Sequence, residues 1–496
     1  MSKKIFLVKP VEALIRESES GQGLKRTLTA TNLTMLGIGA IIGAGIFVLT
    51  GTAAANAAGP AIVFSFIIAG LGCLFAGLCY AEFASMIPIA GSAYTYGYAT
   101  LGELAAWIIG WDLILEYLFS AATVAVGWSG NFVSLLKSSG IIIPAAVAQA
   151  PLAYDGASFT TTGAFINLPA VLLILAMTVL LVVGMQESAK LNNLIVFVKI
   201  AIVLLVIGFG FQYVHTANWE PFVPAVQILP DGTSRYGWHG IVQGAAIVFF
   251  SYIGFDAVST AAQEAKNPQR DMPIGMLTSL GVCTILYILM SLVLTGMVSY
   301  RTLNVPDPVL VALAAAGPGL KWLYFLTGIG AIAGLASVVL VMLMGQPRIF
   351  YAMSRDGLLP AVFGKVHPKY NTPYIATIIT GVIAAIFAGI FPIGLLGELV
   401  SIGTLLAFII VCGGIILLRH TNPGLNRPFR TPLVPWVPIL GILICGYMML
   451  NLGFDTWMRL VIWMAIGLLV YFLYGRHHSK LQQQSKSAAQ PTTSTR

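Results

Sequence analysis

Long apolar runs recur through almost the whole chain, and they constrain its fold more than any other feature. Each run is about 20 residues long, which is the length of helix that spans the hydrocarbon core of a bilayer. Charged residues make up 9% of the 496 residues and hydrophobic residues 58%, too few charges to cover a soluble protein of this size. The sequence therefore predicts an all-α integral membrane protein.

Twelve transmembrane helices are expected from these runs. They lie at residues 33–54, 60–85, 104–130, 167–185, 191–213, 240–262, 274–298, 322–350, 374–391, 395–418, 433–452 and 456–474. Residues 1–30 are expected to form a cytoplasmic N-terminal arm. The polar residues 475–496 are expected to form a disordered cytoplasmic tail.

The distribution of Lys and Arg predicts the orientation of the chain. With both termini in the cytoplasm, 20 of the 26 basic residues fall in cytoplasmic segments and 5 in external ones. Cytoplasmic loops of membrane proteins carry such an excess. We therefore expect a multi-pass protein of the inner (plasma) membrane whose positive charge faces membrane lipid, with no nucleic-acid partner.

The cysteines and histidines make several other classes of protein improbable. All five cysteines lie inside predicted spans, so no disulfide-linked heavy chain is expected. All six histidines lie in loops, at span ends or in the tail, so no intramembrane metal or haem site is expected. We predict no cofactor and no metal.

One lysine lies unusually deep. Lys199 is about nine residues past the start of its span, roughly 13 Å along the helix. A lysine near a span end can extend its side chain to the membrane surface. The alternative is a lysine packed in the protein interior, where burial disfavours the charged form and makes its proton exchangeable.

Three carboxylates also lie inside predicted spans, where a charge is costly. Asp112 and Glu116 are four residues apart and share one helical face, either as a satisfied polar pair or beside a cationic partner. Asp256 follows a helix-weak stretch, where it can hold a cationic ligand, cap freed N–H groups or carry a proton. Glu82 and Glu103 lie near span ends and are expected at the membrane interface.

Two of the predicted helices contain weak points, and they lie five spans apart. The first carries "GIGAIIGAGIF" at 37–47, and the sixth carries "FFSYIGFDA" at 249–257. Such a pair is typical of transporters built from two inverted repeats. A broken helix offers N–H groups to a carboxylate and carbonyls to an ammonium, and an amino acid needs both. The alternative is that the glycines only allow close helix packing.

With "QEAKNPQRDMPIG" (263–275) and "GQPRIFYAMSRDGLLP" (345–360), these stretches resemble the amino acid–polyamine–organocation superfamily. The last stretch, with "GWDLILEY" and "NWEPFVP", is most similar to the cationic amino acid transporter branch, and twelve spans suggest a bacterial member. The resemblance covers residues 25–430. It implies a leucine-transporter-type 5+5 inverted repeat over 31–420 with helices 1 and 6 broken, and peripheral helices 11 and 12 over 421–474.

The resemblance also implies a binding site made largely of backbone. The loop whose N–H groups bind the substrate carboxylate matches Gly43, Ala44 and Gly45. The carbonyls that receive the ammonium match Ile41, Phe250, Ser251 and Ile253, and Phe250 is also the aromatic gate. Lys199 matches a lysine that replaces the second sodium site in proton-coupled relatives. We add Asp256 and Glu116 as possible partners of a cationic substrate side chain.

These observations predict a proton-coupled L-amino-acid transporter, a symporter working by alternating access, rather than an enzyme. Its expected substrates are cationic or small neutral amino acids such as arginine, lysine or alanine. An exchanger or a sodium-coupled transporter of the same fold is the alternative, and a channel or membrane enzyme is disfavoured by the small number of deep ionisable groups. At the end of span eight, Arg348, Arg355 and Asp356 form either a gating salt bridge or a positive-inside anchor.

Overall fold

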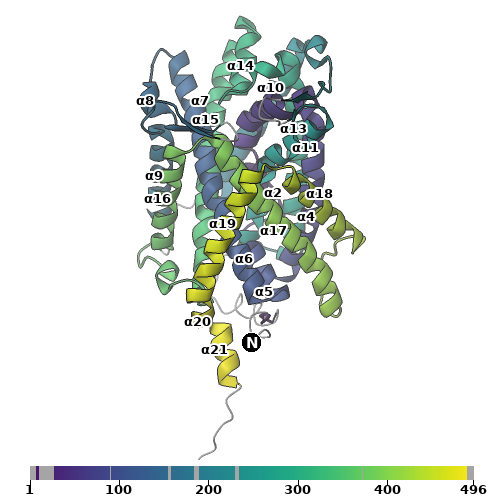
Figure 1. Cartoon of the computed structure of the whole chain (residues 1–496), viewed down its shortest axis with the longest axis vertical. Coiled ribbons are helices and arrows are strands. Elements are labelled where there is room, and N and C mark those ends of the chain that lie inside the picture. Colours follow the sequence, from purple (N-terminus) through teal and green to yellow (C-terminus); the bar gives the residue numbers. More distant parts are fainter. Residues whose placement is uncertain are drawn as a thin grey trace, which may run out of the picture.

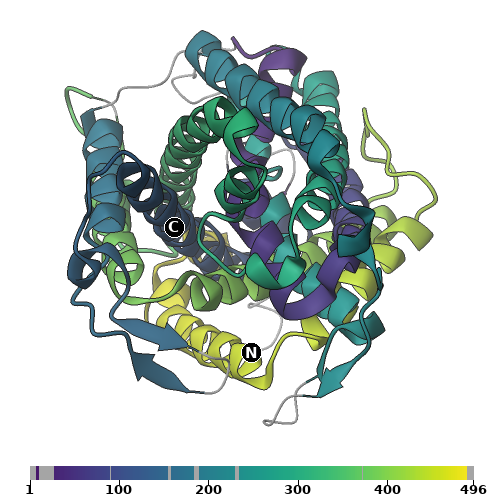
Figure 2. The same ribbon diagram turned by 90° about the horizontal axis from the view of Figure 1, so that it is seen from above.

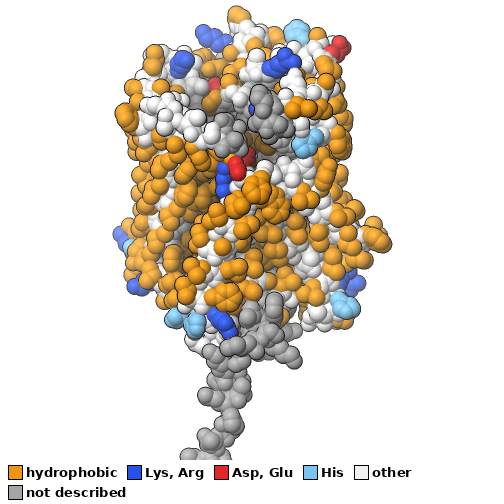
Figure 3. All heavy atoms as spheres, viewed as in Figure 1, with side chains coloured by type: hydrophobic (Ala, Val, Ile, Leu, Met, Phe, Trp, Pro, Cys, Tyr) orange, Lys and Arg blue, Asp and Glu red, His pale blue; other side chains and the backbone are white. Residues whose placement is uncertain are grey.

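The structure is a computed structural model that describes residues 7–10, 27–89, 91–154, 158–183, 189–228, 234–370 and 372–488. Long helices run side by side along the longest axis of the molecule (Figure 1), and seen from above they are arranged around its centre (Figure 2). Hydrophobic side chains form a broad band around the middle, while most of the visible Lys, Arg and His side chains lie towards the two ends (Figure 3). This is the surface of a membrane-spanning helical bundle.

The elements follow one another in this order. The α-helices are α2 (Ala30–Ile41), α3 (Thr50–Ala53), α4 (Ile62–Met86), α5 (Ser92–Thr100), α6 (Glu103–Ile114), α7 (Ser120–Ser138), α8 (Ala145–Ala148), α9 (Leu168–Val183), α10 (Ala189–Gly210), α11 (Gly237–Val248), α12 (Ala257–Thr260), α13 (Pro268–Met297), α14 (Pro308–Ala315), α15 (Lys321–Arg355), α16 (Tyr374–Ile390), α17 (Ile393–Thr421), α18 (Trp436–Leu450), α19 (Phe454–Val470), α20 (Arg476–His478) and α21 (Lys480–Ala488). Two small antiparallel hairpins pair β1 (Leu152–Tyr154) with β2 (Phe159–Thr161) and β3 (Gln227–Ile228) with β4 (Ser234–Arg235).

Each predicted span falls on an apolar helical stretch. Among the described residues, 8 helical segments are long and apolar enough to cross a membrane, and three shorter apolar helices accompany them. The first segment, Ala30–Met86, is 57 residues long and contains both the 33–54 and the 60–85 predictions. The chain turns between them at Gly59, whose φ of +62° favours glycine. The chain is thus a mostly helical, multi-pass membrane protein.

Both weak stretches lie in the centre of the bundle. Every residue from 37 to 51 and from 248 to 262 for which a burial is described is buried. Helix α13 packs against α2 and α4, while α10 and α15 also contact α2. Irregular backbone at membrane depth is tolerated where other protein elements surround it.

The C-terminal tail differs from the prediction. Residues 476–478 and 480–488 are helical rather than disordered, and residues 489–496 lie outside the described residues. Helix α21 is held because Ser479 and Gln482 donate to the carboxylate of Glu103, whose side chain is wholly buried within the protein. Tyr471 also donates to Glu103, at 2.9 Å. A polar composition did not reveal these specific partners.

Other charged groups at this end of the bundle are also paired. Glu82, expected at the interface, is buried against Arg419, with N–O distances of 2.7 and 3.0 Å, and against Arg427. Asp356 pairs with Lys9 at 2.9 Å instead of with Arg348 or Arg355. Most of the predicted N-terminal arm, residues 1–6 and 11–26, lies outside the described residues.

Candidate substrate site

The first predicted weak point is a real break in the helix. Helix α2 ends at Ile41, Ile42 adopts an extended conformation, and helical structure resumes at Ala44 and continues as a π-helical turn over Gly45–Leu49. Ending a helix leaves its last carbonyls without intrahelical donors. The prediction of a break within residues 37–47 is confirmed.

A lysine from another helix meets the freed carbonyls. The Nζ of Lys199, on α10, lies 3.0 Å from the Gly39 carbonyl oxygen and 3.3 Å from that of Ile42. Its side chain is 2% exposed and therefore does not extend to the membrane surface. A cation at a helix C-terminus is favourable because the helix dipole is negative there. The interior position, one of the two alternatives for this lysine, is the one observed.

The second break faces the first. After α11 the chain makes a 3-10 turn over Phe249–Tyr252, extends at Ile253 and passes through Gly254 at φ +114° before α12. A Cβ on Gly254 would lie 3.1 Å from the carbonyl carbon of Ala40. A Cβ on Gly45 would lie 2.6 Å from the Cα of Ser251. Glycine therefore serves the break and the close packing at once, so the two alternatives for these glycines are not exclusive.

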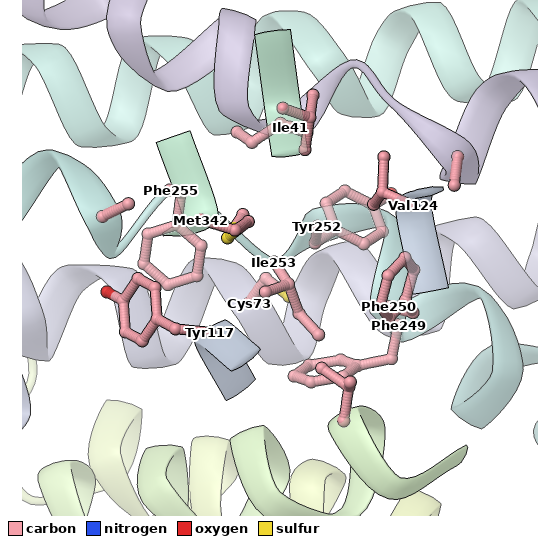
Figure 4. Close-up of a cluster of buried hydrophobic side chains, with 14 of the residues drawn as sticks. Ile41, Cys73, Tyr117, Val124, Phe249, Phe250, Tyr252, Ile253, Phe255 and Met342 are labelled. Atoms are coloured by element: carbon pink, nitrogen blue, oxygen red, sulfur yellow. The ribbon is translucent and has the colours of Figure 1, made fainter. Parts of the chain in front are cut away.

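A narrow cavity of about 10 Å³, roughly the space of one water molecule, lies between the two breaks. Six predicted residues line it, namely Ile41, Gly43, Ala44, Gly45, Phe250 and Ile253, and so do Ala40, Ser120, Val124, Val338 and Met342. Figure 4 labels five of the lining residues with their neighbours. Ser120 contributes the one side-chain polar atom of this lining, and its hydroxyl has no partner among the described residues. The cavity thus combines broken backbone with apolar side chains.

The predicted carboxylates lie away from this lining. Asp112, Glu116 and Asp256 are at most 1% exposed, yet none is among the residues that line the cavity. The Oδ2 of Asp256 accepts a hydrogen bond from the Tyr117 hydroxyl at 2.8 Å, and its side chain does not cap α12. Among the described residues, the carboxylate oxygens of Asp112 and Glu116 have no hydrogen-bond partner.

Comparison with known proteins places the chain in a family. A model of the family described as "Amino acid permease" matches residues 28–472. The chain belongs to the amino acid permease family. It is a transporter, not an enzyme, and its family implies a leucine-transporter-like fold.

Curated relatives cover nearly the whole permease. The methylthioribose transporter of Bacillus subtilis (strain 168) is 50% identical over 479 residues, 97% of this chain and 99% of the relative. The branched-chain amino acid permease BcaP of the same organism is 48% identical over 484 residues, 97% and 100%. The vacuolar cationic amino acid transporter 4 of Arabidopsis thaliana is 32% identical over 572 residues, 92% and 93%. The superfamily prediction is confirmed, while the cationic branch is the more distant of these three relatives.

Sequence reasoning missed five residues that line the permease cavity. Ser120 and Val124 continue by steps of four the face on which Glu116 lies, so helical spacing offered a signal for them. Val338 and Met342 are also four apart on α15, but nothing distinguishes them from the other apolar residues of that helix. Ala40 immediately precedes the predicted Ile41.

No metal centre is present among the described residues of the permease. They contain no group of three or more His, Cys, Asp or Glu side chains that could hold a metal ion. The five cysteines are free and buried, and all lie within the helices α4, α13, α17 and α18.

Proposed function

We propose that the permease is a proton-coupled symporter that carries a neutral branched-chain L-amino acid across the plasma membrane by alternating access. The observation that carries the proposal is the cavity between the two breaks, which offers backbone groups for an amino acid and apolar side chains for its side chain. The 48% identity of the permease with the branched-chain amino acid permease BcaP of Bacillus subtilis supports the same substrate class.

The backbone of the cavity suits a zwitterion. Gly43, Ala44 and Gly45 begin the second half of the broken first helix, where N–H groups lack intrahelical acceptors and the helix dipole is positive. These groups bind the substrate carboxylate. We assign the substrate ammonium to the carbonyls of Ile41 and Ser251, one from each break. Both carbonyl oxygens lie 2.7 Å from the hydroxyl oxygen of Tyr287, so they are close enough to share a donor.

The side chains of the cavity favour a neutral substrate. Val124, Phe250, Ile253, Val338 and Met342 line it, and neither Glu116 nor Asp256 does. A guanidinium or ammonium side chain buried against such a lining would have no counter-ion, which is costly. Isoleucine, leucine or valine would gain from the same contacts. Arginine, lysine and the smaller alanine are therefore expected to be poorer substrates.

Lys199 supports coupling to a proton rather than to sodium. Its ammonium contacts two carbonyl oxygens at the first break, and a bound cation there leaves no room for a sodium ion on the same carbonyls. Loss of its proton would remove the charge that caps this helix end. Protonation of Lys199 therefore biases the position of α2. The buried carboxylates Glu116 and Asp256 are further candidates to hold a proton.

The proposed architecture follows the family. Twelve spans form a ten-helix inverted repeat over 31–420 and two peripheral helices over 421–474, with both termini cytoplasmic. Phe250, which lines the cavity and is 5% exposed, acts as the gate that closes over the substrate.

Methylthioribose is the second candidate substrate, because a transporter of that name is 50% identical to this chain. A methylthio sugar has an apolar end that suits the cavity, but it has neither the carboxylate nor the ammonium that the two breaks would bind. The two candidates therefore make different demands on the backbone of the site.

Uptake into proteoliposomes tests the proposal. Purified permease is reconstituted without sodium, and an inside-alkaline pH gradient drives uptake of labelled isoleucine, with leucine, valine, alanine, arginine, lysine and methylthioribose as unlabelled competitors. We expect gradient-dependent uptake that the branched-chain amino acids inhibit most strongly. Uptake that needs sodium, or that only methylthioribose inhibits, would contradict the proposal.

A further inference from the structure

One tyrosine connects the two breaks. Tyr287, on α13, is wholly buried, and its hydroxyl oxygen lies 2.7 Å from the Ile41 carbonyl oxygen and 2.7 Å from that of Ser251. The Ile41 carbonyl lies at the end of α2, and the Ser251 carbonyl lies in the 3-10 turn at the second break. These are two of the carbonyls to which we assign the substrate ammonium.

We propose that the Tyr287 hydroxyl substitutes for the substrate ammonium when the site is empty, and so allows the permease to close and return without cargo. The inference rests on the proposed function. Both Ile41 and Ser251 are 2% exposed, so their carbonyls have little access to water. A buried carbonyl without a donor costs free energy. The hydroxyl supplies a donor that stays in place when no ammonium is bound.

The hydroxyl can do this without blocking the substrate. It has one hydrogen and donates to one carbonyl at a time, whereas an ammonium has three and can serve both. Tyr287 is not among the residues that line the cavity, so it reaches the carbonyls from outside it. Ile41 lines the cavity, and its carbonyl oxygen has a second lone pair for a donor such as the substrate ammonium.

Surrounding rings hold Tyr287 in position. Its ring centroid lies 5.2 Å from that of Phe66 on α4 and 5.3 Å from that of Tyr252. Tyr252 donates its own hydroxyl to the Phe66 carbonyl at 2.8 Å. Because Tyr252 belongs to the same cluster but serves a carbonyl outside the substrate site, it provides a matched control.

The consequence concerns the step that returns the empty carrier. In net uptake the permease closes and reorients without substrate, and its carbonyls then depend on Tyr287. In exchange it returns loaded, and the ammonium supplies the donors. Loss of the hydroxyl should therefore slow net uptake and leave exchange nearly unchanged.

The test compares both modes for wild type, Tyr287→Phe and Tyr252→Phe. Labelled isoleucine uptake is measured into empty proteoliposomes and into proteoliposomes loaded with unlabelled isoleucine. We expect Tyr287→Phe to lower net uptake about tenfold and exchange less than about twofold, a difference equivalent to roughly 1 kcal/mol in the empty return step. Tyr252→Phe should leave the ratio of the two modes as in the wild type.

Equal loss of both modes in Tyr287→Phe, or no loss in either, would overturn the inference and leave the proposed function standing. A wild type that moves isoleucine in neither mode would overturn both. Stabilisation of the variant by isoleucine in a thermal-shift assay reports that it is folded. Should the phenylalanine variant not fold, Tyr287→Met removes the same hydroxyl and must shift the ratio in the same direction.

Discussion

The two interrupted helices solve the same problem in different ways. At the first break, donors from other helices meet the freed carbonyls: Lys199 from α10 and Tyr287 from α13. At the second break, which lies in the sixth predicted span, the chain carries its own acid. This residue, Asp256, accepts a hydrogen bond from Tyr117 instead of capping the next helix. The first break therefore depends on the Lys199 ammonium, a charge that loss of a proton would remove, whereas the Ser251 carbonyl of the second break is met by the neutral hydroxyl of Tyr287.

This difference assigns different work to the two breaks. The shape of the first can respond to protonation, since the carbonyls of Gly39 and Ile42 are capped by an ammonium. The second is fixed by Gly254, whose missing Cβ lets the backbone rest on Ala40, and it contributes Phe250 and Ile253 to the cavity. We infer that the first break couples proton movement to transport, and that the second break shapes the pocket for the substrate side chain.

The largest effect is expected where the breaks touch. Gly45→Val places side-chain atoms where Ser251 backbone lies, 2.6 Å from a Cβ on residue 45. Isoleucine binding should fall at least about 100-fold, or about 2.7 kcal/mol. Gly43→Ala is the milder comparison, because its Cβ would meet a Val338 methyl at 3.1 Å, a side chain that can shift. If a binding assay shows unchanged isoleucine affinity for the valine variant, Gly45 serves helix packing and not substrate binding.

A smaller effect is expected from removal of the cation at the first break. Lys199→Ala leaves the Gly39 and Ile42 carbonyls without their ammonium, and pH-driven isoleucine uptake should fall about tenfold or more. Equilibrium binding should be retained in part, because Lys199 does not line the cavity. Normal proton-dependent uptake by this variant in proteoliposomes would remove the lysine from the coupling mechanism.

The acids near the second break should affect affinity still less. Asp256→Asn and Glu116→Gln are nearly isosteric, and neither residue lines the cavity. We expect each to change isoleucine affinity by less than about threefold, under 1 kcal/mol. Competition by arginine is the informative control. A large loss of affinity, or arginine binding that depends on either acid, would restore these residues as substrate ligands.

The smallest effect is expected on the segment that packs on the second half of the first helix, after its break. Asp307 precedes α14, whose Pro308 packs against Gly51. Burial raises the pKa of Asp307, against opposing effects of Ser134 and Lys137. The contribution of protonated Asp307 to the free energy of unfolding is therefore fully present below the ordinary carboxyl pKa, about 3.9. This contribution is lost as the pH rises through the raised pKa.

Asp307→Asn should accordingly raise the melting temperature slightly at pH 7.5 and have little effect near pH 4. The measurement is thermal unfolding of the purified protein at both pH values. A variant that is less stable than the wild type at pH 7.5 would show that the carboxylate is favourable in its folded surroundings.

Sequence reasoning located the breaks because their causes are local. Four glycines in eleven residues at 37–47, and Gly254 beside Ser251, disfavour a continuous helix wherever the chain folds. The same local signals, with the resemblance, identified six of the residues that line the cavity. Apolar runs predicted the helices for an equally local reason, the length needed to cross a bilayer.

The partners of buried polar groups could not be predicted in this way. Glu103 is stabilised by Ser479 and Gln482, more than 370 residues away, so nothing near Glu103 signalled its burial. Tyr287 was likewise one tyrosine among 18 until the fold brought its hydroxyl to two carbonyls. Spacing reported that Glu116 lies on one helical face, but not that this face meets the cavity only from Ser120 onwards.

Equilibrium binding to the purified permease tests most directly whether the cavity between the breaks is a site for neutral branched-chain amino acids. Labelled isoleucine is bound to the wild type and displaced by leucine, arginine or methylthioribose, with Gly45→Val as the site control. The account predicts saturable binding that leucine displaces at least about tenfold more effectively than arginine or methylthioribose, and that Gly45→Val abolishes. Displacement by arginine or methylthioribose but not by leucine, or full binding to Gly45→Val, would contradict it.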